Sequence, residues 1–291
     1  MFFIVASLLI QGSHCRVSTQ DIIKENLAKI QAWNKEGGSD TKFAPNQFVV
    51  YTEEETKRLL GIQEVEVNFS RVVDSKSDRE LEQGPPPSFD WRWFGAVTTP
   101  RFSAVQSPFH EAAINTIESA YFRVSGTLAE FSALEVEQCS EDNPNTDLVA
   151  AFKYIAKNKR LGSVKGYGRP SKCAASSTEN AMTDGLVSGY TNISAGDDNS
   201  LVNSMMRYPV LAAVRVSQKW TFYNSGVLNS ADCEAGNPNH AVQIVAYTPT
   251  WYTVKNSWGP QWGEEGYMRL ERGQGANPCG VLNYVVEPEV E

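Results

Sequence analysis

The stretch spanning residues 239–267 constrains this chain more than any other part of its sequence. An apolar, β-branched run predicts a β-strand over residues 241–247, and His240 stands directly before it. A second strand is predicted over residues 251–255, and Asn256 follows it directly. The two polar side chains therefore mark the start of one strand and the end of the next. An asparagine amide can hold an imidazole ring in one orientation, as the aspartate does in a serine-protease triad.

Residues 257–263, next to this asparagine, are unusually rich in glycine and tryptophan. Trp258 and Trp262 are large enough to shield a bond between His240 and Asn256 from water. A single histidine is more often structural than functional. The glycine- and tryptophan-rich residues 257–263 favour a functional His240–Asn256 pair over a structural histidine.

The remainder of the sequence predicts helices first and strands later. Apolar residues recur at helical spacing over residues 108–125 and 146–158. Residues 16–62 are also predicted to be mainly helical, apart from a break near residues 37–40. A further strand is predicted over residues 210–216. This order indicates an α+β chain with a helical half and a β half, and the cleft between two such halves is a usual place for a site.

The composition excludes several classes of protein. The chain has 26 Lys and Arg residues against 34 Asp and Glu residues, a formal net charge of −8, and neither half is basic. A nucleic-acid binder carries a Lys/Arg patch, so that function is not expected. The longest apolar run, residues 2–10, is too short to span a bilayer. A soluble globular enzyme or binding protein is therefore expected.

The first residues indicate the secretory pathway. Residues 2–10 have the length of a signal-peptide core, and small residues follow them near Cys15. A signal peptide is therefore predicted over residues 1–15, with a truncated or unprocessed start as the alternative. Two N-x-S/T sequons, at Asn68 and Asn192, are glycosylation candidates that fit secretion.

The other cysteines are Cys139, Cys173, Cys233 and Cys279. An even number in an exported chain favours two disulfides, and three pairings are open. A zinc site is not favoured, because the chain has no C-x-x-C pair and only three histidines. Neither a metal nor another cofactor is expected.

Residues 72–87 are first charged and then rich in proline, ending in three consecutive prolines at residues 85–87. Such a composition is typical of an extended linker and offers a processing site. The linker separates an N-terminal segment from the main part of the chain.

Several motifs together resemble the papain family of cysteine peptidases, of the cathepsin L type. The most specific is the block over residues 239–267. Residues 88–98 resemble the start of the mature enzyme, and residues 130–139 resemble the segment that leads to a disulfide cysteine. Motifs of the family's pro-region are matched in part by Asn26, Ile30, Asn34, Asn46 and Phe48.

The resemblance implies a papain-like α+β fold of two domains, a helical left domain and a β-barrel-like right domain. It implies an inhibitory-type pro-segment over residues 16–71, lying across the cleft, and a peptidase domain over residues 88–291. It also implies a monomer that is extracellular or lysosomal. For the site, the resemblance implies that His240 is the general base and acid, that Asn256 orients it, and that Trp258 covers the pair. The implied disulfides are Cys139–Cys173 and Cys233–Cys279.

The sequence departs from the family at the residue that carries the chemistry. Active members have a cysteine at the start of the central helix, where the helix dipole and a nearby imidazolium favour the thiolate. Counting back from Glu118 places this position at Pro108, and counting forward from Gly95 places it at Phe109. Neither residue can attack a carbonyl group.

The oxyanion-hole glutamine of the family is also replaced. It should fall near Phe102 or Ser103, and neither carries an amide, while Gln106 lies too close to the nucleophile position. The residues expected to line the cleft are Phe102, Phe109 and Trp258.

The start of this helix nevertheless keeps good helix-forming residues. Ser107 suits the N-cap, Pro108 suits the first helical position, and Glu111 complements the dipole of the first turn. The helix is therefore expected to be kept although its nucleophile is lost.

A sequence error over residues 101–111 would also remove the nucleophile. The first disulfide of the family argues against this explanation, because cysteines are missing both near Val105 and near residues 143–145. A local error would have left one of these two cysteines without its partner.

The leading hypothesis is a papain-like protein without peptidase activity that binds a peptide or a protein ligand, for instance a protease or a protease inhibitor. The alternative is an active hydrolase that uses Ser107 as a substitute nucleophile with His240 and Asn256. A third hypothesis, a metal-dependent activity through His110 and His240, is weak because catalytic zinc usually needs three protein ligands. Packing or capping in the first helical turn is favoured for His110.

Overall fold

The computed structural model describes residues 18–36, 40–62, 84–103, 105, 107–141, 147–175, 181 and 187–290. Its helices are α1 (Thr19–Glu36), α2 (Glu53–Leu59), α3 (Pro108–Ser125), α4 (Ala133–Cys139), α5 (Ala150–Asn158), α6 (Val164–Tyr167), α7 (Asp198–Met205) and α8 (Gln218–Thr221), with 3-10 turns η1 (Trp91–Phe94), η2 (Ser230–Asp232) and η3 (Pro278–Gly280). Its strands are β1 (Lys42–Phe43), β2 (Phe89–Asp90), β3 (Val187–Ile193), β4 (Val210–Val214), β5 (Tyr223–Ser225), β6 (Val227–Leu228), β7 (His240–Tyr247), β8 (Trp251–Lys255), β9 (Tyr267–Glu271) and β10 (Tyr284–Val290).

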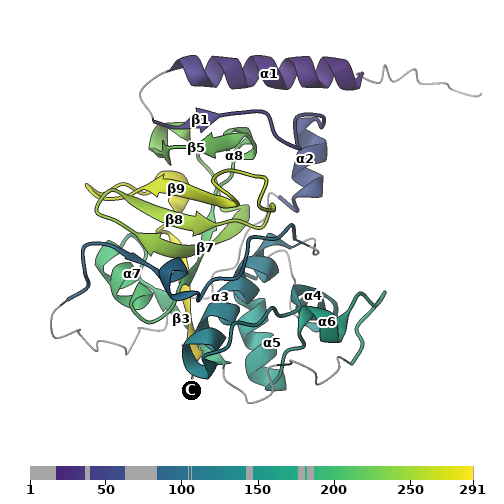
Figure 1. Cartoon of the computed structure of the whole chain (residues 1–291), viewed down its shortest axis with the longest axis vertical. Helices are drawn as coiled ribbons and strands as arrows, with labels where there is room; N and C mark the ends of the chain where they lie inside the picture. The colour runs from purple at the N-terminus through teal and green to yellow at the C-terminus, as the bar shows by residue number, and fades with distance from the viewer. Residues whose placement is uncertain are drawn as a thin grey trace, which may run out of the picture.

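The chain forms a helical half and a β half, with its N-terminal residues lying over the β half (Figure 1). The helical half contains α3, α4, α5 and α6. In the β half the strands follow the order β3-β10-β4-β7-β8-β9-β6, and β2 pairs with β7. Helix α3 packs on β7, and α5 packs on β3. This is the α+β arrangement that the sequence predicts.

Helix α3 lies at the centre of the molecule. Pro108 occupies its first turn, where a missing N–H and a fixed φ are tolerated, and Gly126 ends it in the left-handed conformation. Every residue from Pro108 to Ala120 is buried. A helix buried on all sides must lie between other elements, and here its apolar residues share one cluster with Phe152 of α5 and Ala241 of β7.

The register of three neighbouring strands fixes where the candidate site lies. Val214 of β4 pairs with His240 of β7, and Gln243 of β7 pairs with Lys255 of β8. All of β7 is buried. Because β7 begins at His240 and β8 ends at Lys255, the next residue, Asn256, comes to lie beside the histidine.

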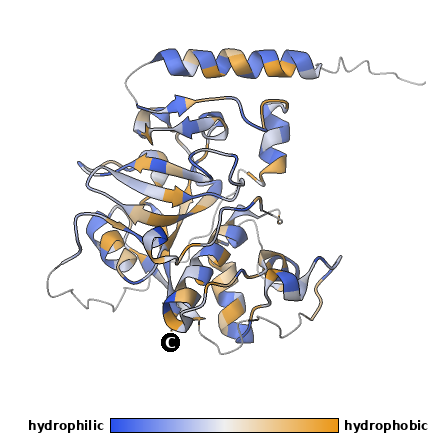
Figure 2. Ribbon diagram, in the orientation of Figure 1, coloured by the Kyte–Doolittle hydropathy of each residue, from blue (hydrophilic) through white to orange (hydrophobic). Residues whose placement is uncertain are grey.

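The described residues between 19 and 62, which we call the N-terminal segment, contain α1, β1 and α2. Strand β1 pairs in antiparallel fashion with β5 of the β half. Helix α2 begins with a capping box formed by Thr52 and Glu55. Apolar and polar residues alternate along α1 (Figure 2), and Ile30 on one side of it is buried.

The two disulfides expected from the family resemblance are present. Cys139 is bonded to Cys173, and Cys233 is bonded to Cys279. One of the three possible pairings is thereby selected. The first bond holds the end of α4, and the second joins two turns of the β half.

Some predicted boundaries differ from the structure. The helix predicted over residues 146–158 begins later, at Ala150. The strand predicted over residues 210–216 is shorter, because the amide of Val216 donates to the side chain of Asn239 at 2.8 Å and not to a neighbouring strand.

The N-terminal region is less helical than the sequence predicts, because the described part of residues 16–62 includes β1 and a turn before α2. The predicted signal peptide over residues 1–15, Asn68 and residues 72–83 of the predicted linker lie outside the described residues. In the described part of the chain, no helix combines the length and the apolar character needed to cross a bilayer.

Substituting Phe48 tests whether the N-terminal segment belongs to the core. The Phe48 side chain is fully buried, and its ring centroid lies 6.1 Å from that of Trp258. We expect Phe48→Ala to lower the free energy of unfolding by about 3–5 kcal/mol, because it removes buried apolar area and leaves a cavity. Urea denaturation measures this loss. Leu59→Ala is the control, because Leu59 is 45% exposed; equally small losses in both variants would show that the segment lies outside the core.

Candidate functional site

His240 and Asn256 form a hydrogen-bonded pair between the two halves. The imidazole Nε2 lies 2.9 Å from the amide Oδ1, and both residues are buried. The same Oδ1 accepts from the backbone amide of Ser257 at 2.8 Å, which fixes the orientation of the side-chain amide. An amide oxygen only accepts, so Nε2 carries the hydrogen. The other ring nitrogen, Nδ1, is left as an acceptor.

Two tryptophans separate this pair from water. The Trp258 ring lies 5.1 Å from the His240 ring, and Trp262 lies 5.0 Å from Trp258. Burial lowers the pKa of His240 to about 4, and the hydrogen bond with Asn256 opposes this shift only in part. At neutral pH the imidazole is therefore uncharged.

The start of α3 carries no cysteine. Pro108 is the first residue of the helix, and Phe109 behind it is buried in the core. Ser107 stands at the N-cap position, as the sequence predicts, but its side chain makes no capping bond. Its backbone amide donates instead to Glu137 Oε1 at 3.2 Å. The N-terminal turn of α3 is thus built from a proline and a tethered amide, without a thiol.

Three buried polar atoms of the site have no hydrogen-bond partner: His240 Nδ1, Asn256 Nδ2 and Trp258 Nε1. Leaving such an atom unpaired in a protein interior costs about 1–3 kcal/mol. The unpaired Nδ1 is also the atom that remains for a nucleophile, because Nε2 is bonded to Asn256. No hydroxyl is hydrogen-bonded to it, so Ser107 and His240 do not form a catalytic pair in this conformation.

Phe102 lies in the region where the family resemblance places the oxyanion-hole glutamine. It forms a β-bridge with Trp258, and the neighbouring amide of Ser103 donates to Ser257 O at 2.9 Å. The Phe102 side chain is 47% exposed. An aromatic ring offers no donor to a developing oxyanion. Phe102 and Ser103 therefore attach the loop to the site without supplying a side-chain amide.

The space above the start of α3 is nearly filled. A cavity of about 10 Å³, roughly room for one water, lies between the end of α2 and the site. Its lining consists of Leu59, Leu60, Phe102, Ser103, Val105, Pro108, Ser257 and Trp258. The end of α2 thus lies against Phe102, Pro108 and Trp258, beside the start of α3.

A buried polar network that the sequence analysis missed joins α3 to β8. Lys255 Nζ donates to Thr98 Oγ1 at 2.7 Å and to Asn115 Oδ1 at 2.8 Å. The Thr98 hydroxyl donates to Glu118 Oε2 at 2.5 Å. Burial lowers the pKa of Lys255 to about 8, although the nearby Glu118 carboxylate favours the charged form.

Arg101 extends this network to the first turn of α3. Its guanidinium lies 2.7 Å from Glu111 Oε1 and 2.9 Å from Glu118 Oε1. Burial raises the pKa of Glu111, and the charge of Arg101 opposes that increase. Glu111 stands in the first turn of α3, as the sequence predicts, and it is also the buried partner of an arginine, which the sequence analysis did not predict. Its place among apolar residues of α3 is the signal that could have revealed its burial.

His110 is buried in the helical half, and neither of its ring nitrogens has a hydrogen-bond partner. Burial lowers its pKa to about 4. This agrees with the prediction that it packs in the first turn of α3. Within the described ranges, no three His, Cys, Asp or Glu side chains are grouped so that they could hold a metal ion.

Comparisons with known proteins find similarity along most of the chain. A family model described as papain family cysteine protease matches residues 85–289. Cysteine proteinase 5 of Dictyostelium discoideum is 27% identical over 302 residues, which cover 93% of this chain and 86% of the relative. Cathepsin J of Rattus norvegicus is 29% identical over 288 residues, 92% of this chain and 84% of the relative.

Solved structures show the same overall similarity. A recombinant stem bromelain precursor superposes with a TM-score of 0.79 at 27% identity, covering 94% of this chain and 91% of its own. Digestive procathepsin L 3 from the larval midgut of Tenebrio molitor superposes with a TM-score of 0.77 at 26% identity and the same coverage. Because these matches span more than nine-tenths of the chain, they include most of its N-terminal segment.

The low pKa of the buried histidines predicts acid sensitivity. For His110 the pKa is about 4 in the folded protein against a reference value of 6.5. Between these values the unfolded chain binds a proton that the folded chain does not. The free energy of unfolding therefore falls as the pH drops below 6.5, by about 2 kcal/mol per histidine between pH 7 and pH 5.

His110→Leu isolates this contribution, because leucine remains apolar and binds no proton. We expect the variant to lose about 2 kcal/mol less than the parent protein over the same pH range. Urea denaturation at pH 7 and pH 5 gives the two differences. Identical losses in parent and variant would contradict the prediction.

Proposed function

The chain belongs to the papain family of cysteine proteases, and from that premise we propose that it is a member without peptidase activity that acts by binding a peptide or a protein ligand. The observation that carries this proposal is the replacement of the nucleophile. Pro108 is the first residue of α3, and the Nδ1 atom of His240 has no hydrogen-bond partner. The general base is present, but no nucleophile among the described residues is hydrogen-bonded to it.

The electrostatics of the site support the same conclusion. A catalytic thiolate is stabilised by a helix N-terminus and by a nearby imidazolium. Burial keeps His240 neutral at pH 7, since its pKa is about 4. A proline at the helix start has neither a thiol nor an N–H. The thiolate of the expected ion pair is therefore absent, and its imidazole partner is uncharged.

The absent oxyanion amide would limit a substitute nucleophile too. Losing one oxyanion-hole donor lowers kcat by about 10²–10³. Phe102 and Ser103 supply no side-chain amide, and the Ser103 backbone amide is already bonded to Ser257. A Ser107 nucleophile would therefore lack both a bond to His240 and a donor for the developing charge. These observations favour binding over hydrolysis.

Retention of the His240–Asn256 pair is compatible with a non-catalytic protein. The 2.9 Å bond joins the start of β7 to the turn after β8, and Trp258 packs on it. Removing either partner would leave another buried polar group unpaired, at a cost of about 1–3 kcal/mol. The pair therefore has a structural role that does not depend on a nucleophile.

We also propose a domain organisation for the chain and its passage through the secretory pathway. A leader over residues 1–15 would direct the chain into the secretory pathway, followed by a pro-segment (16–71), a linker (72–87) and a papain-like domain (88–291). The two disulfides support an oxidising compartment, extracellular or lysosomal. Asn192, on β3, is the glycosylation candidate among the described residues.

Hydrolysis of a mixed peptide library, with and without reductant, tests the proposed lack of activity. The sample is the protein cut within the proline-rich linker, compared with the His240→Ala and Ser107→Ala variants. We expect no turnover above background in any of the three, because none contains a nucleophile next to the base. Turnover that is lost in both variants would overturn the proposal and identify Ser107 as the nucleophile.

A further inference from the structure

The N-terminal segment shares the hydrophobic core of the β half. Phe43, Phe48 and Leu60 belong to the same buried cluster as Trp220 and Trp258. Phe48 is fully buried, and Phe43 and Leu60 are nearly so. Burying a side chain of this size contributes about 1.5–3 kcal/mol each. The segment is thus packed as the interior of a domain is packed.

Polar bonds fix the segment along the cleft as well. The Ala44 amide donates to Phe222 O at 2.9 Å, and Asn46 Nδ2 donates to Thr221 O at 2.8 Å. Further on, Gln47 Nε2 donates to Trp258 O at 3.3 Å. These bonds continue the pairing of β1 with β5 toward the tryptophan that covers His240. The segment is therefore held by its backbone and not only by apolar side chains.

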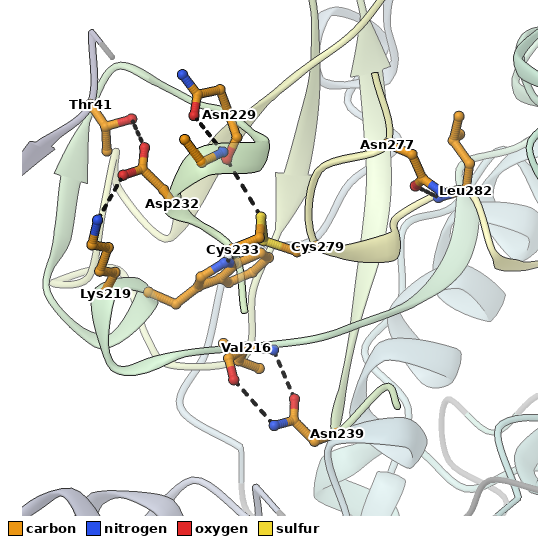
Figure 3. The surroundings of a disulfide bond; sticks show 12 residues. Thr41, Val216, Lys219, Asn229, Asp232, Cys233, Asn239, Asn277, Cys279 and Leu282 are labelled. Atoms are coloured by element: carbon orange, nitrogen blue, oxygen red, sulfur yellow. Dashed lines mark hydrogen bonds and ion pairs between the residues drawn. A yellow bond between two sulfur atoms is a disulfide. The ribbon is translucent and has the colours of Figure 1, made fainter. Parts of the chain in front are cut away.

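A charged contact anchors the other end of β1 (Figure 3). The Thr41 hydroxyl lies 3.0 Å from Val227 O and 3.3 Å from Asp232 Oδ2. Lys219 Nζ bridges Asp232 Oδ1 at 3.1 Å and Glu36 Oε2 at 2.7 Å. We call Glu36, Thr41, Lys219 and Asp232 the latch. It contains two residues of the segment and two of the β half.

The two latch residues of the β half, Lys219 and Asp232, are each next in sequence to a residue that forms or contacts a disulfide. Asp232 is directly followed by Cys233, which is bonded to Cys279. Trp220 Nε1 donates to Cys279 Sγ at 3.1 Å, and Trp220 directly follows Lys219. Figure 3 shows the disulfide together with Thr41, Lys219 and Asp232 of the latch. Asp232 thus ends a turn, η2, that is directly followed by a disulfide cysteine, and Lys219 lies on α8, next to the tryptophan that contacts the same disulfide.

We propose that the N-terminal segment is a permanent part of the mature protein, fixed by the latch, and that any ligand of the cleft must compete with it. The proposal rests in part on the proposed lack of activity, because a chain without a nucleophile cannot cut its own linker. It also rests on the contacts above, which persist if another protease cuts the linker. The segment then stays bound as a separate chain.

The first test is the intact mass of the protein secreted from eukaryotic cells. We expect a mass that includes the N-terminal segment, or two chains that separate only in denaturant. In parallel, a specific protease site is inserted into the linker, within residues 72–83, and the purified protein is cut there. Gel filtration at about 1 μM and pH 7 should show both fragments eluting together. A segment that separates from a still-folded remainder would overturn the proposal.

Variants of the latch give the second test, in the cut protein with a fluorescent label on the segment. We expect Thr41→Val and Lys219→Met each to speed release of the segment on dilution by about tenfold, which corresponds to about 1.4 kcal/mol. Lys153→Met is the matched control, because Lys153 pairs with Asp147 at 2.6 Å in the helical half. Release at the parental rate in both latch variants would overturn the role of the latch.

Should Lys219→Met prevent folding, Thr41→Val still tests the role of the latch, since it keeps the shape of the side chain and replaces only the hydroxyl with a methyl group.

The two proposals fail in different ways. Peptide hydrolysis by the cut complex, with the segment still attached, would overturn the lack of activity and leave retention standing. Release of the segment without any hydrolysis would overturn retention alone.

Discussion

The burial of α3 on every side from Pro108 to Ala120 is the constraint on which the rest of this structure depends. A helix inside a protein must satisfy its polar side chains internally, because an unpaired buried group costs about 1–3 kcal/mol. Here Gln243 donates to Asn115 O and to Ser119 Oγ, both at 2.9 Å. Lys255 and Glu118 complete the connection through Thr98. These bonds join the helix to β7 and β8, so the two halves are held together without help from any catalytic group.

The same arrangement separates the requirements of the fold from those of the chemistry. Packing at the start of α3 needs a helix-initiating residue and an apolar neighbour, and Pro108 and Phe109 meet both needs. Catalysis needs a thiol that is close to an imidazole and partly exposed to substrate. Nothing in the packing of α3 enforces that second requirement. The nucleophile can therefore be absent while the helix, the His240–Asn256 bond and the covering Trp258 keep their places.

The features that were predictable from sequence are those with strong local signals. The span of α3 follows from Pro108 and Gly126, and the position of His240 beside Asn256 follows from two short apolar strands. Features that depend on tertiary contacts escaped prediction. Strand β1 exists because a strand of the β half, β5, accepts it, and the buried Glu111 is paired with Arg101 from the segment that leads into α3. The short strand has no periodicity that a sequence pattern could reveal, and the position of Glu111 among apolar residues signals burial without naming its partner.

Burial also connects the retained pair to the N-terminal segment. Trp258 contacts His240 on one side, while Phe48 packs against it and Gln47 bonds its carbonyl from the other. The segment thus helps to keep the imidazole dry, and a dry imidazole is neutral, with a pKa of about 4. An active enzyme must uncover this site to form its ion pair and admit substrate. Under the proposed lack of activity, uncovering the site brings no gain and exposes large apolar side chains such as Phe48. That proposal and the contacts of the segment therefore both favour its retention.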